Sequence, residues 1–393
     1  MLVLVAPGQG AQTPGFLTPW LEFPGFRERL AWLGACADLD LEHFGTEAGA
    51  DEIRDTAVTQ PLLVASGLVS ALALFPHPVD AFRRIGAVAG HSVGEIAAAA
   101  GAGVISAEQA MVFVRERGRA MSAAAEGEAT SMLAVLGGDE EAVLAKLADY
   151  DLTPANVNGA GQIVAAGAVD ALEKLKADPP EGARLRPLQV AGAFHTSYMA
   201  GAVEGLRALA AAVTTRDPRT RVISNRDGSV VHSGAEMLGR LVDQVALPVR
   251  WDLVMRTMKD LGVTAVIEMP PAGTLTGLVR RALPGVETLA LKTPDDLDAA
   301  RRLVEEHGEA SPLENQPTWR LVVAPQAGTI RRGDAAPGTA LPTGGEVATL
   351  VTRRDEHPIT TRHGGTLVEW LVEDGDPVSP GQPLVRLHPE GSL

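Results

Sequence analysis

A serine framed by two glycines is the first residue whose setting indicates chemistry. In GAVAGHSVGEIAAAAG, residues 86–101, Ser92 stands in the pattern G-x-S-x-G between a short apolar run and an alanine-rich segment. A serine hydroxyl attacks an acyl carbon when a base takes its proton and a sharp strand-to-helix turn exposes its oxygen. Gly90 and Gly94 occupy the positions where such a turn tolerates only small residues, and the helix start favours a developing anion. Ser92 is therefore a candidate nucleophile.

The sequence also offers a base and an oxyanion site. His195, in AGAFHTSYM, follows a strand-like segment and is a candidate general base. The glycine-rich loop APGQGAQ, residues 6–12, follows the first strand-like run and can present backbone N–H groups to an oxyanion. The backbone N–H groups of Gln9 and Val93 are the natural donors for such a site.

Three arginines on one helix-like segment, VRERGRAM, add positive charge. They are Arg115, Arg117 and Arg119. A run of charge on a helix usually forms a solvated face, so at least two of the three are expected to face water.

The segments that must position these residues alternate in type. Over residues 1–125, strand-like runs at Leu2–Ala6 and Ala87–Ala89 alternate with helix-like runs at Leu62–Leu74 and Ala107–Ala125. This alternation predicts an α/β domain with a mostly parallel sheet. Residues 130–194 then follow the order strand, helix, strand, strand, helix, strand. That order is typical of a ferredoxin-like unit, so we expect a small subdomain inserted into the large one.

A second, smaller domain is predicted after a polar, proline-containing linker at residues 304–318. Without gaps and with an offset of 37 residues, positions 328–350 overlay positions 365–387. Two strand-rich halves joined by a short turn predict a small β domain with one shared core.

The motifs of the first 300 residues, taken in order, carry a resemblance. They are GQGAQ, TQP at 59–61, GHSVGE, an Arg-Gly pair, ANVNGAGQIV, GAFH and QVALPVRW. This ordered set resembles the malonyl-CoA:acyl carrier protein transacylase family, including the acyltransferase domains of polyketide synthases. The resemblance implies a large α/β-hydrolase-like subdomain over 1–128 and 195–303, and a ferredoxin-like subdomain over 129–194.

The resemblance also implies a role for each matching residue. Ser92 matches the family's nucleophile, His195 its base, and Arg117 the arginine that pairs with the free carboxylate of the malonyl group. Val93 after the serine and Phe194 before the histidine accompany malonyl rather than methylmalonyl preference. The backbone N–H groups of Gln9 and Val93 match the family's oxyanion hole. The Gln244 backbone carbonyl matches the group that orients the histidine. The residues that match the lining of the family's cleft are Gln60, His91, Asn158 and Phe194.

The activity implied is a ping-pong transfer of malonyl from malonyl-CoA, through an ester on Ser92, to the phosphopantetheine thiol of acyl carrier protein. It supplies extender units for fatty-acid and possibly polyketide synthesis and uses no cofactor and no metal. A serine hydrolase or thioesterase of carboxyacyl thioesters is the alternative enzyme. An α/β-hydrolase needs an acidic residue before its histidine, but Asp and Glu are so frequent between Ser92 and His195 that this criterion does not discriminate. A hydrolase usually also has an HGGG-like loop, which is absent from this sequence. A non-catalytic scaffold is the alternative from another class.

The C-terminal repeat, residues 319–390, resembles biotinyl and lipoyl carrier domains, in which a lysine on the turn between the halves is modified. Here that turn is VTRRDEHPI, residues 351–359, and the equivalent position is about Arg354. No lysine follows Lys292, so neither biotin nor lipoate attachment is expected. We therefore predict a degenerate module that serves either for packing or for binding an unidentified protein partner.

The composition excludes several other classes. The net charge of −15, with no basic run, argues against a nucleic-acid partner. No apolar run appears long enough to span a membrane, and the N-terminus reads as a strand rather than a signal peptide. A single cysteine, Cys36, fits a reducing cytoplasm.

Overall fold

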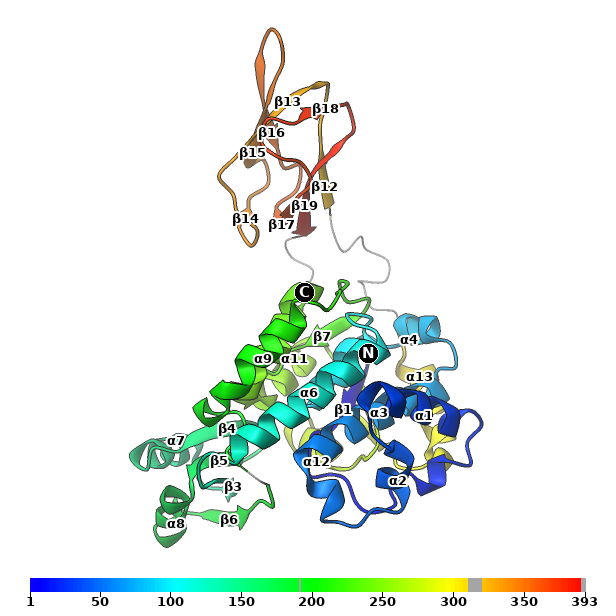
Figure 1. Cartoon of the computed structure of the whole chain (residues 1–393), viewed down its shortest axis with the longest axis vertical. Helices are drawn as coiled ribbons and strands as arrows, with labels where there is room; N and C mark the ends of the chain where they lie inside the picture. Colours follow the sequence, from blue (N-terminus) through cyan, green and yellow to red (C-terminus); the bar gives the residue numbers. More distant parts are fainter. Residues whose placement is uncertain (191, 310–319, 390–393) are drawn as a thin grey trace. The chain divides into compact units, whose positions relative to one another are not determined.

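The protein is described by a computed structural model that covers residues 1–190, 192–309 and 320–389 (Figure 1). The chain divides into two compact units, Met1–Glu314 and Asn315–Leu393.

The first unit is built on a mostly parallel sheet, as predicted. Its strand order is β11-β10-β1-β2-β7-β8, and only the pairing of β7 with the edge strand β8 is antiparallel. The carboxyl ends of β1, β2 and β7 therefore lie side by side, where loops gather functional side chains. The strands are β1 (Leu2–Ala6), β2 (Ala87–Gly90), β7 (Arg221–Ile223), β8 (Val230–Val231), β10 (Ala265–Glu268) and β11 (Glu287–Ala290).

Helices cover both faces of this sheet, because successive side chains of a strand point to opposite sides. Leu2 and Leu4 of β1 pack in one core with α3 and α6, whereas Val3 and Val5 pack in another with α11 and α12. The helices on the first face are α1 (Phe26–Ala37), α3 (Thr56–Leu74), α5 (Gly94–Gly101), α6 (Ala107–Ala125) and α13 (Leu297–His307), and those on the second are α11 (Trp251–Asp260) and α12 (Thr274–Ala282).

Other helices and single turns complete this unit. The α-helices are α2 (Leu41–Thr46), α4 (Pro78–Arg84), α9 (Ala200–Ala210) and α10 (Gly234–Asp243). The 3-10 turns are η1 (Thr18–Trp20), η2 (Glu52–Arg54), η3 (Ser197–Met199), η4 (Gln244–Ala246) and η5 (Pro294–Asp296).

Helix α3 corrects one expectation from the sequence. By length and composition its 19 residues could cross a membrane, although no run of that kind was expected. In the fold, 72% of its apolar window is buried inside the protein. Helix α3 is therefore a core helix that packs against α1, α5 and α6.

The ferredoxin-like subdomain forms with the predicted element order. It comprises β3 (Thr130–Gly137), α7 (Glu140–Asp149), β4 (Thr153–Gly159), β5 (Gln162–Ala168), α8 (Val169–Ala177) and β6 (Ala183–Pro187). Helices α7 and α8 cover one face of the sheet (Figure 1). A fifth strand, β9 (Val249–Arg250), pairs in parallel with β4. The expected boundary of 129–194 therefore omits a strand, because strand pairing depends on spatial neighbours that sequence order does not reveal.

The predicted start of the linker is also wrong. Residues 304–307 are the last turn of α13, and Val304 is buried in the core together with Leu297, Ala300 and Leu303. This spacing places the apolar side chains on one face of a helix. Because that face packs in the core, the helix continues to His307. Most of the linker, residues 310–318, lies outside the described residues.

The second unit consists of two four-stranded sheets, ordered β12-β19-β17-β14 and β16-β15-β13-β18. The predicted repeat is confirmed: β13, β14 and β15 each begin 37 residues before β17, β18 and β19. The bounds are β12 (Arg320–Val323), β13 (Gly328–Arg332), β14 (Ala340–Leu341), β15 (Glu346–Val351), β16 (Glu356–Thr360), β17 (Gly365–Trp370), β18 (Pro377–Val378) and β19 (Pro383–Pro389).

The two halves of this unit are related by an approximate two-fold exchange. Gly338 donates its N–H to Leu367 O, and Gly375 donates in the same way to Ile330 O. Each donor and each acceptor in one bond lies 37 residues from its counterpart in the other. The sequence repeat is therefore a repeat of hydrogen bonds that close one core.

Candidate active site

The serine lies on a strained turn between β2 and α5. Ser92 has a φ of +52°, in the left-handed region that a side chain rarely adopts. A Cβ at Gly90 would lie 2.0 Å from the carbonyl carbon of Gly94, and a Cβ at Gly94 would lie 2.2 Å from the carbonyl oxygen of Ala6. The two glycines are therefore required by close backbone contacts, and the turn holds Ser92 above the sheet.

A histidine from a distant segment meets this serine. Nε2 of His195 lies 2.7 Å from Oγ of Ser92, and Nδ1 lies 2.8 Å from the backbone carbonyl oxygen of Gln244. A carbonyl only accepts, so Nδ1 carries the proton and the Nε2 lone pair faces the serine hydroxyl. His195 is also held at a φ of +61°. The pair has the geometry of a nucleophile and its base.

Burial keeps the histidine neutral. His195 is 3% exposed, and loss of solvation, followed by the nearby charge of Arg117, lowers its pKa to about 3. The hydrogen bond to the Gln244 carbonyl opposes this shift without reversing it. At neutral pH His195 is therefore an unprotonated base.

The backbone N–H groups near the serine differ in whether they have a hydrogen-bond acceptor. The N–H of Ser92 donates to Oδ1 of Asn225 at 2.8 Å, so it does not point at an acyl oxygen. Within the described part of the chain, the structure gives neither the Val93 nor the Gln9 N–H a hydrogen-bond acceptor. The loop that carries Gln9 is tied to η2, since the side chain of Gln9 donates to Arg54 O at 3.3 Å.

Asn225 holds the serine turn and was missed by the sequence reasoning. It follows β7 at the carboxyl edge of the sheet, beside β2, and its Nδ2 donates to Gly90 O at 2.6 Å. Its amide thus bonds both a donor and an acceptor of the turn. The signal was an asparagine just after the short segment RVIS, which would have required the order of the strands to interpret.

Arg117 is the buried member of the arginine group. It is fully buried, and its guanidinium donates to Oε1 of Gln60 at 2.6 Å and to Oε1 of Gln244 at 2.8 Å. Its Nε has no hydrogen-bond partner among the described residues. Burial lowers its pKa to about 10, so it stays charged at neutral pH. Gly118 permits this placement, because a Cβ there would lie 2.9 Å from Thr56 O of the neighbouring helix.

Of the other two arginines, Arg119 is exposed as predicted, whereas Arg115 is half-buried. Arg115 and Arg119 both pair with Glu116, at 2.6 Å and 3.4 Å, and their side chains are 25% and 50% exposed.

The side chain of Gln244 links these groups, whereas the sequence pointed only to its backbone carbonyl. Its Nε2 donates to Ser92 O at 3.1 Å and to Oε2 of Glu95. Glu95, from GHSVGE, is 1% exposed and was not singled out from the sequence. Burial raises its pKa to about 7, although hydrogen bonds from Asn225, Ser224 and Gln244 oppose the shift.

The expected cleft residues lie near the serine with distinct contacts. Nε2 of His91 lies 2.8 Å from Oδ1 of Asn158, so a residue of the serine turn contacts a residue of β4 in the small subdomain. Burial lowers the pKa of His91. Phe194 is buried in the main core, directly before His195.

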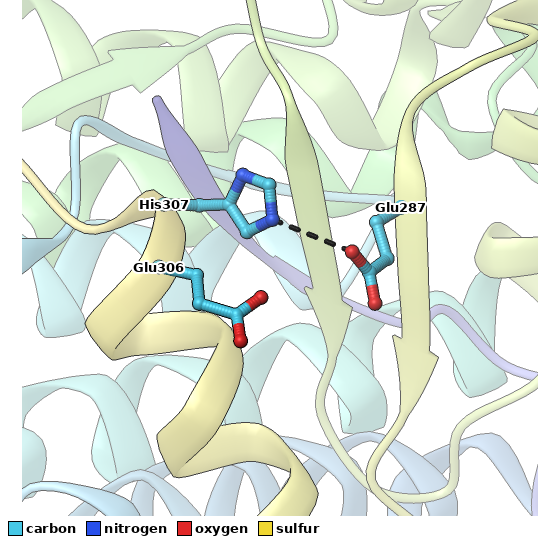
Figure 2. Close-up of side chains that lie close together, drawn as sticks. All are labelled: Glu287, Glu306 and His307. Atoms are coloured by element: carbon cyan, nitrogen blue, oxygen red, sulfur yellow. Dashed lines mark ion pairs between the residues drawn. The ribbon is translucent and has the colours of Figure 1, made fainter.

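One group of side chains could hold a metal ion by distance alone. Glu287, Glu306 and His307 place ligand atoms within 4.8 Å of one another (Figure 2). Both glutamates are exposed, and Nε2 of His307 forms an ion pair with Glu287 at 3.4 Å. The contacts are those of a surface ion pair and lie apart from the serine turn.

A cavity of about 790 Å³ also lies apart from the serine turn. Its lining is largely apolar, from α3, α4 and α5, and includes one cation, Arg216, but no carboxylate and no histidine. It therefore offers no base for acyl chemistry.

Comparisons with known proteins show the family to which the first unit is similar. Residues 3–299 match the family described as acyl transferase domain. The malonyl CoA-acyl carrier protein transacylase of Mycobacterium tuberculosis H37Rv is 52% identical over 303 residues, covering 77% of this chain and 100% of that protein.

Solved structures give the same result. The crystal structure of MCAT from Mycobacterium tuberculosis aligns with a TM-score of 0.74 at 52% identity, covering 77% of this chain and 99% of that chain. A type II PKS acyl-carrier protein in complex with its malonyl-transacylase aligns with a TM-score of 0.71 at 28% identity, over 77% and 99%. The family match ends at residue 299, before the second unit begins.

Proposed function

The chain belongs to the acyl transferase family and is an [acyl-carrier-protein] S-malonyltransferase, and from that premise we propose that Ser92 and His195 carry out the transfer. The reaction moves a malonyl group from malonyl-CoA to acyl carrier protein for fatty acid synthesis. The observation that carries the proposed roles is the 2.7 Å contact between Oγ of Ser92 and Nε2 of His195.

The first half-reaction forms an ester on Ser92. As Oγ attacks the thioester carbonyl carbon, its proton passes to Nε2 of His195. The tetrahedral intermediate then breaks its C–S bond, and the proton on His195 passes to the departing sulfur. The products are the malonyl ester and free coenzyme A.

The second half-reaction uses the same base in reverse order. The phosphopantetheine thiol of the carrier gives its proton to Nε2 of His195, and the sulfur attacks the ester carbonyl. The C–O bond breaks and Oγ of Ser92 recovers the proton. Ser92 and His195 account for every bond and proton exchange in these two steps, so the proposed chemistry requires no cofactor and no metal.

Negative charge on the carbonyl oxygen is stabilised by the N–H groups of Val93 and Gln9. Support comes from the distribution of contacts: the Ser92 N–H is occupied by Asn225, while these two N–H groups have no acceptor within the described residues. One such donor contributes about 3 to 4 kcal/mol in comparable sites.

Arg117 binds the free carboxylate of the malonyl group. Its guanidinium is buried, charged and hydrogen-bonded only to neutral amide oxygens, and its Nε–H is unused among the described residues. A buried cation of this kind binds a carboxylate strongly, and an acetyl group has no carboxylate for it to bind. Val93 and Phe194 fit the same malonyl preference.

The alternative enzyme, a hydrolase, would pass the acyl group to water. Its catalytic histidine is typically oriented by a carboxylate, whereas a backbone carbonyl, that of Gln244, orients His195. The site therefore departs from the arrangement typical of a hydrolase.

Labelling with radioactive malonyl-CoA tests the assignment. We expect one malonyl group on Ser92, stable until carrier is added, and no label on Ser92→Ala. An unlabelled wild-type protein, or rapid release of malonate without carrier, would overturn the proposal.

We place the catalytic function in residues 1–303 and propose that the chain acts in the cytoplasm, supported by its single cysteine. Supply of extender units for polyketide synthesis is part of the same proposal. The second unit contributes no group to the proposed chemistry, and we assign it to packing or to binding a protein partner.

A further inference from the structure

The side-chain amide of Gln244 lies between a buried cation and a buried carboxylate. Its Oε1 accepts from Arg117 at 2.8 Å, and its Nε2 donates to Glu95 and to Ser92 O. The contacts with Arg117 and Glu95 are buried, and the contact with Ser92 O is partly buried. Gln244 thus links Arg117, the residue proposed to bind malonyl, to Glu95, a glutamate with no assigned role.

The carboxylate fixes which way this amide faces. A carboxylate oxygen accepts and does not donate, so it selects the NH₂ end of Gln244 and leaves the oxygen end for Arg117. The reversed amide would place oxygen against oxygen at Glu95 and NH₂ against the guanidinium. Glu95 itself is fixed by the N–H of Asn225, which donates to its Oε1 at 2.7 Å.

The distance of the negative charge from Arg117 is equally important. Among the described residues no ion pair joins Arg117 to a carboxylate, and the nearest countercharge is separated from it by one amide. A carboxylate in direct contact would occupy the guanidinium and compete with the substrate. A carboxylate one amide away keeps the cation in place and leaves its remaining N–H groups free.

We propose that Glu95 is a positioning residue for malonyl selectivity: through the Gln244 amide it orients the Arg117 guanidinium without occupying it. This inference rests on the proposed function, in which Arg117 binds the malonyl carboxylate. The GHSVGE motif would then supply both the nucleophile, Ser92, and a residue for substrate selectivity, Glu95.

The electrostatics of the pair support the geometry. Burial lowers the pKa of Arg117, and Glu95 is the charge that opposes this shift. The charged or polar groups that face Glu95 come from several elements: Arg240 of α10, Ser224 and Asn225 after β7, and Gln244 of η4.

Removing the negative charge from position 95, or moving it to position 244 beside Arg117, tests the inference. The variants are E95Q, which removes it, and E95Q/Q244E, which keeps the net charge but places it against Arg117. The readouts are kcat/KM for malonyl-CoA and for acetyl-CoA, which lacks the carboxylate.

For E95Q we expect malonyl kcat/KM to fall about tenfold, the effect of weakening one charge-assisted hydrogen bond, through KM rather than kcat. Acetyl kcat/KM should stay within about twofold of wild type. For E95Q/Q244E the malonyl loss should reach about 100-fold, because the new carboxylate competes for the guanidinium.

Glu268→Gln is the matched control. Glu268 is also fully buried and accepts N–H bonds from Gly273, Leu275 and Thr276 at the start of α12, but it lies outside the Arg117 network. It should lower stability and leave the ratio of malonyl to acetyl kcat/KM unchanged.

Equal losses for both substrates in E95Q, or improved malonyl binding in either variant, would overturn the inference. If E95Q does not fold, the double variant decides, since it retains a carboxylate in the network. Wild-type labelling of Ser92 separates the two claims: labelling with unchanged selectivity in the variants refutes the role of Glu95 alone.

Discussion

Two turns, one in each unit, show what separates a reactive turn from a structural one. The turn at Ser92 is held from outside: Asn225 bonds its N–H, Gln244 its carbonyl and His195 its hydroxyl. The turn between β15 and β16 is held from within, since Thr352 Oγ1 accepts the N–H groups of Arg354 and Asp355. Chemistry depends on groups that converge from other elements, which the second turn lacks among the described residues.

The two units also accommodate left-handed backbone differently. In the second unit, glycines take the positive φ angles at equivalent positions of the repeat, as at Gly344 and Gly381, both at +79°. In the first unit, Ser92 and His195 adopt positive φ with full side chains, at a cost of about 1 to 3 kcal/mol each. Among the described residues of the second unit only glycines have positive φ, whereas the first unit also places five non-glycine residues there, and two of these five, Ser92 and His195, form the proposed catalytic pair.

The strongest test of this comparison removes the base. His195→Ala should lower malonyl transfer by about 10⁴-fold, the upper end of general base catalysis, because Ser92 then has no acceptor for its proton. Single-turnover acylation measures the effect, with circular dichroism as the folding control. A loss of less than about tenfold would show that His195 is not the base.

Removing the proposed selectivity cation should have the next largest effect. Arg117→Ala should lower malonyl kcat/KM by about 100-fold, since two charge-assisted hydrogen bonds are lost, and leave acetyl transfer unimpaired. Arg117→Lys, the matched control, keeps the charge without the planar fork and should give an intermediate loss. Unchanged selectivity in Arg117→Ala would count against its role.

Loosening the reactive turn should have a smaller effect. Asn225→Ala leaves the Ser92 N–H and Gly90 O without a partner, at a cost of about 1 to 3 kcal/mol in unfolding free energy. We expect acylation to slow about tenfold, because an unpaired Ser92 N–H no longer fixes the serine. Chemical denaturation and acylation kinetics measure both effects. Wild-type kinetics with reduced stability would restrict Asn225 to folding.

The pH dependence should be weaker still. A pKa of about 3 leaves His195 neutral from pH 5 to 9, whereas Glu95, with a pKa of about 7, gains its charge in this interval. Malonyl kcat/KM should therefore rise several-fold through about pH 7 and be flat in E95Q. A rise that persists in E95Q would assign the titration to His195 instead.

The smallest expected effect on activity comes from disrupting the second unit. A Cβ at Gly365 would lie 2.1 Å from His388 O, so Gly365→Ala should destabilise that unit by about 1 to 3 kcal/mol. Malonyl transfer should remain within about twofold of wild type. Gly201→Ala, in α9 of the first unit, is the control for the substitution itself, because nothing lies within 4 Å of a Cβ there and alanine favours a helix, so it should not destabilise the protein. A marked loss of transfer would show that the units depend on each other.

The sequence predicted more of the elements than of their boundaries and partners. The α/β alternation, the ferredoxin-like order and the C-terminal repeat appear in the structure, because each follows from local periodicity. The pairing of β9 with β4 and the extension of α13 through residues 304–307 were not predicted. Both depend on packing against segments distant in the chain.

The candidate site divides in the same way. Ser92, His195, Arg117 and the Gln244 carbonyl were identified from motifs, and the structure brings the four together. Asn225, Glu95 and the Gln244 side chain were not assigned, although Glu95 is part of the serine motif. An asparagine or a buried glutamate has no local signature, since its importance depends on which polar groups surround it.

By itself, the sequence determined which residues could react and that the C-terminal turn has no lysine to modify. Both are properties of residue type and order along the chain. Only the tertiary structure decided which N–H groups are free, which arginine is buried, and which carboxylate lies one amide away from it. Those properties depend on burial and hydrogen bonding between segments far apart in sequence, and only the folded chain brings those segments together.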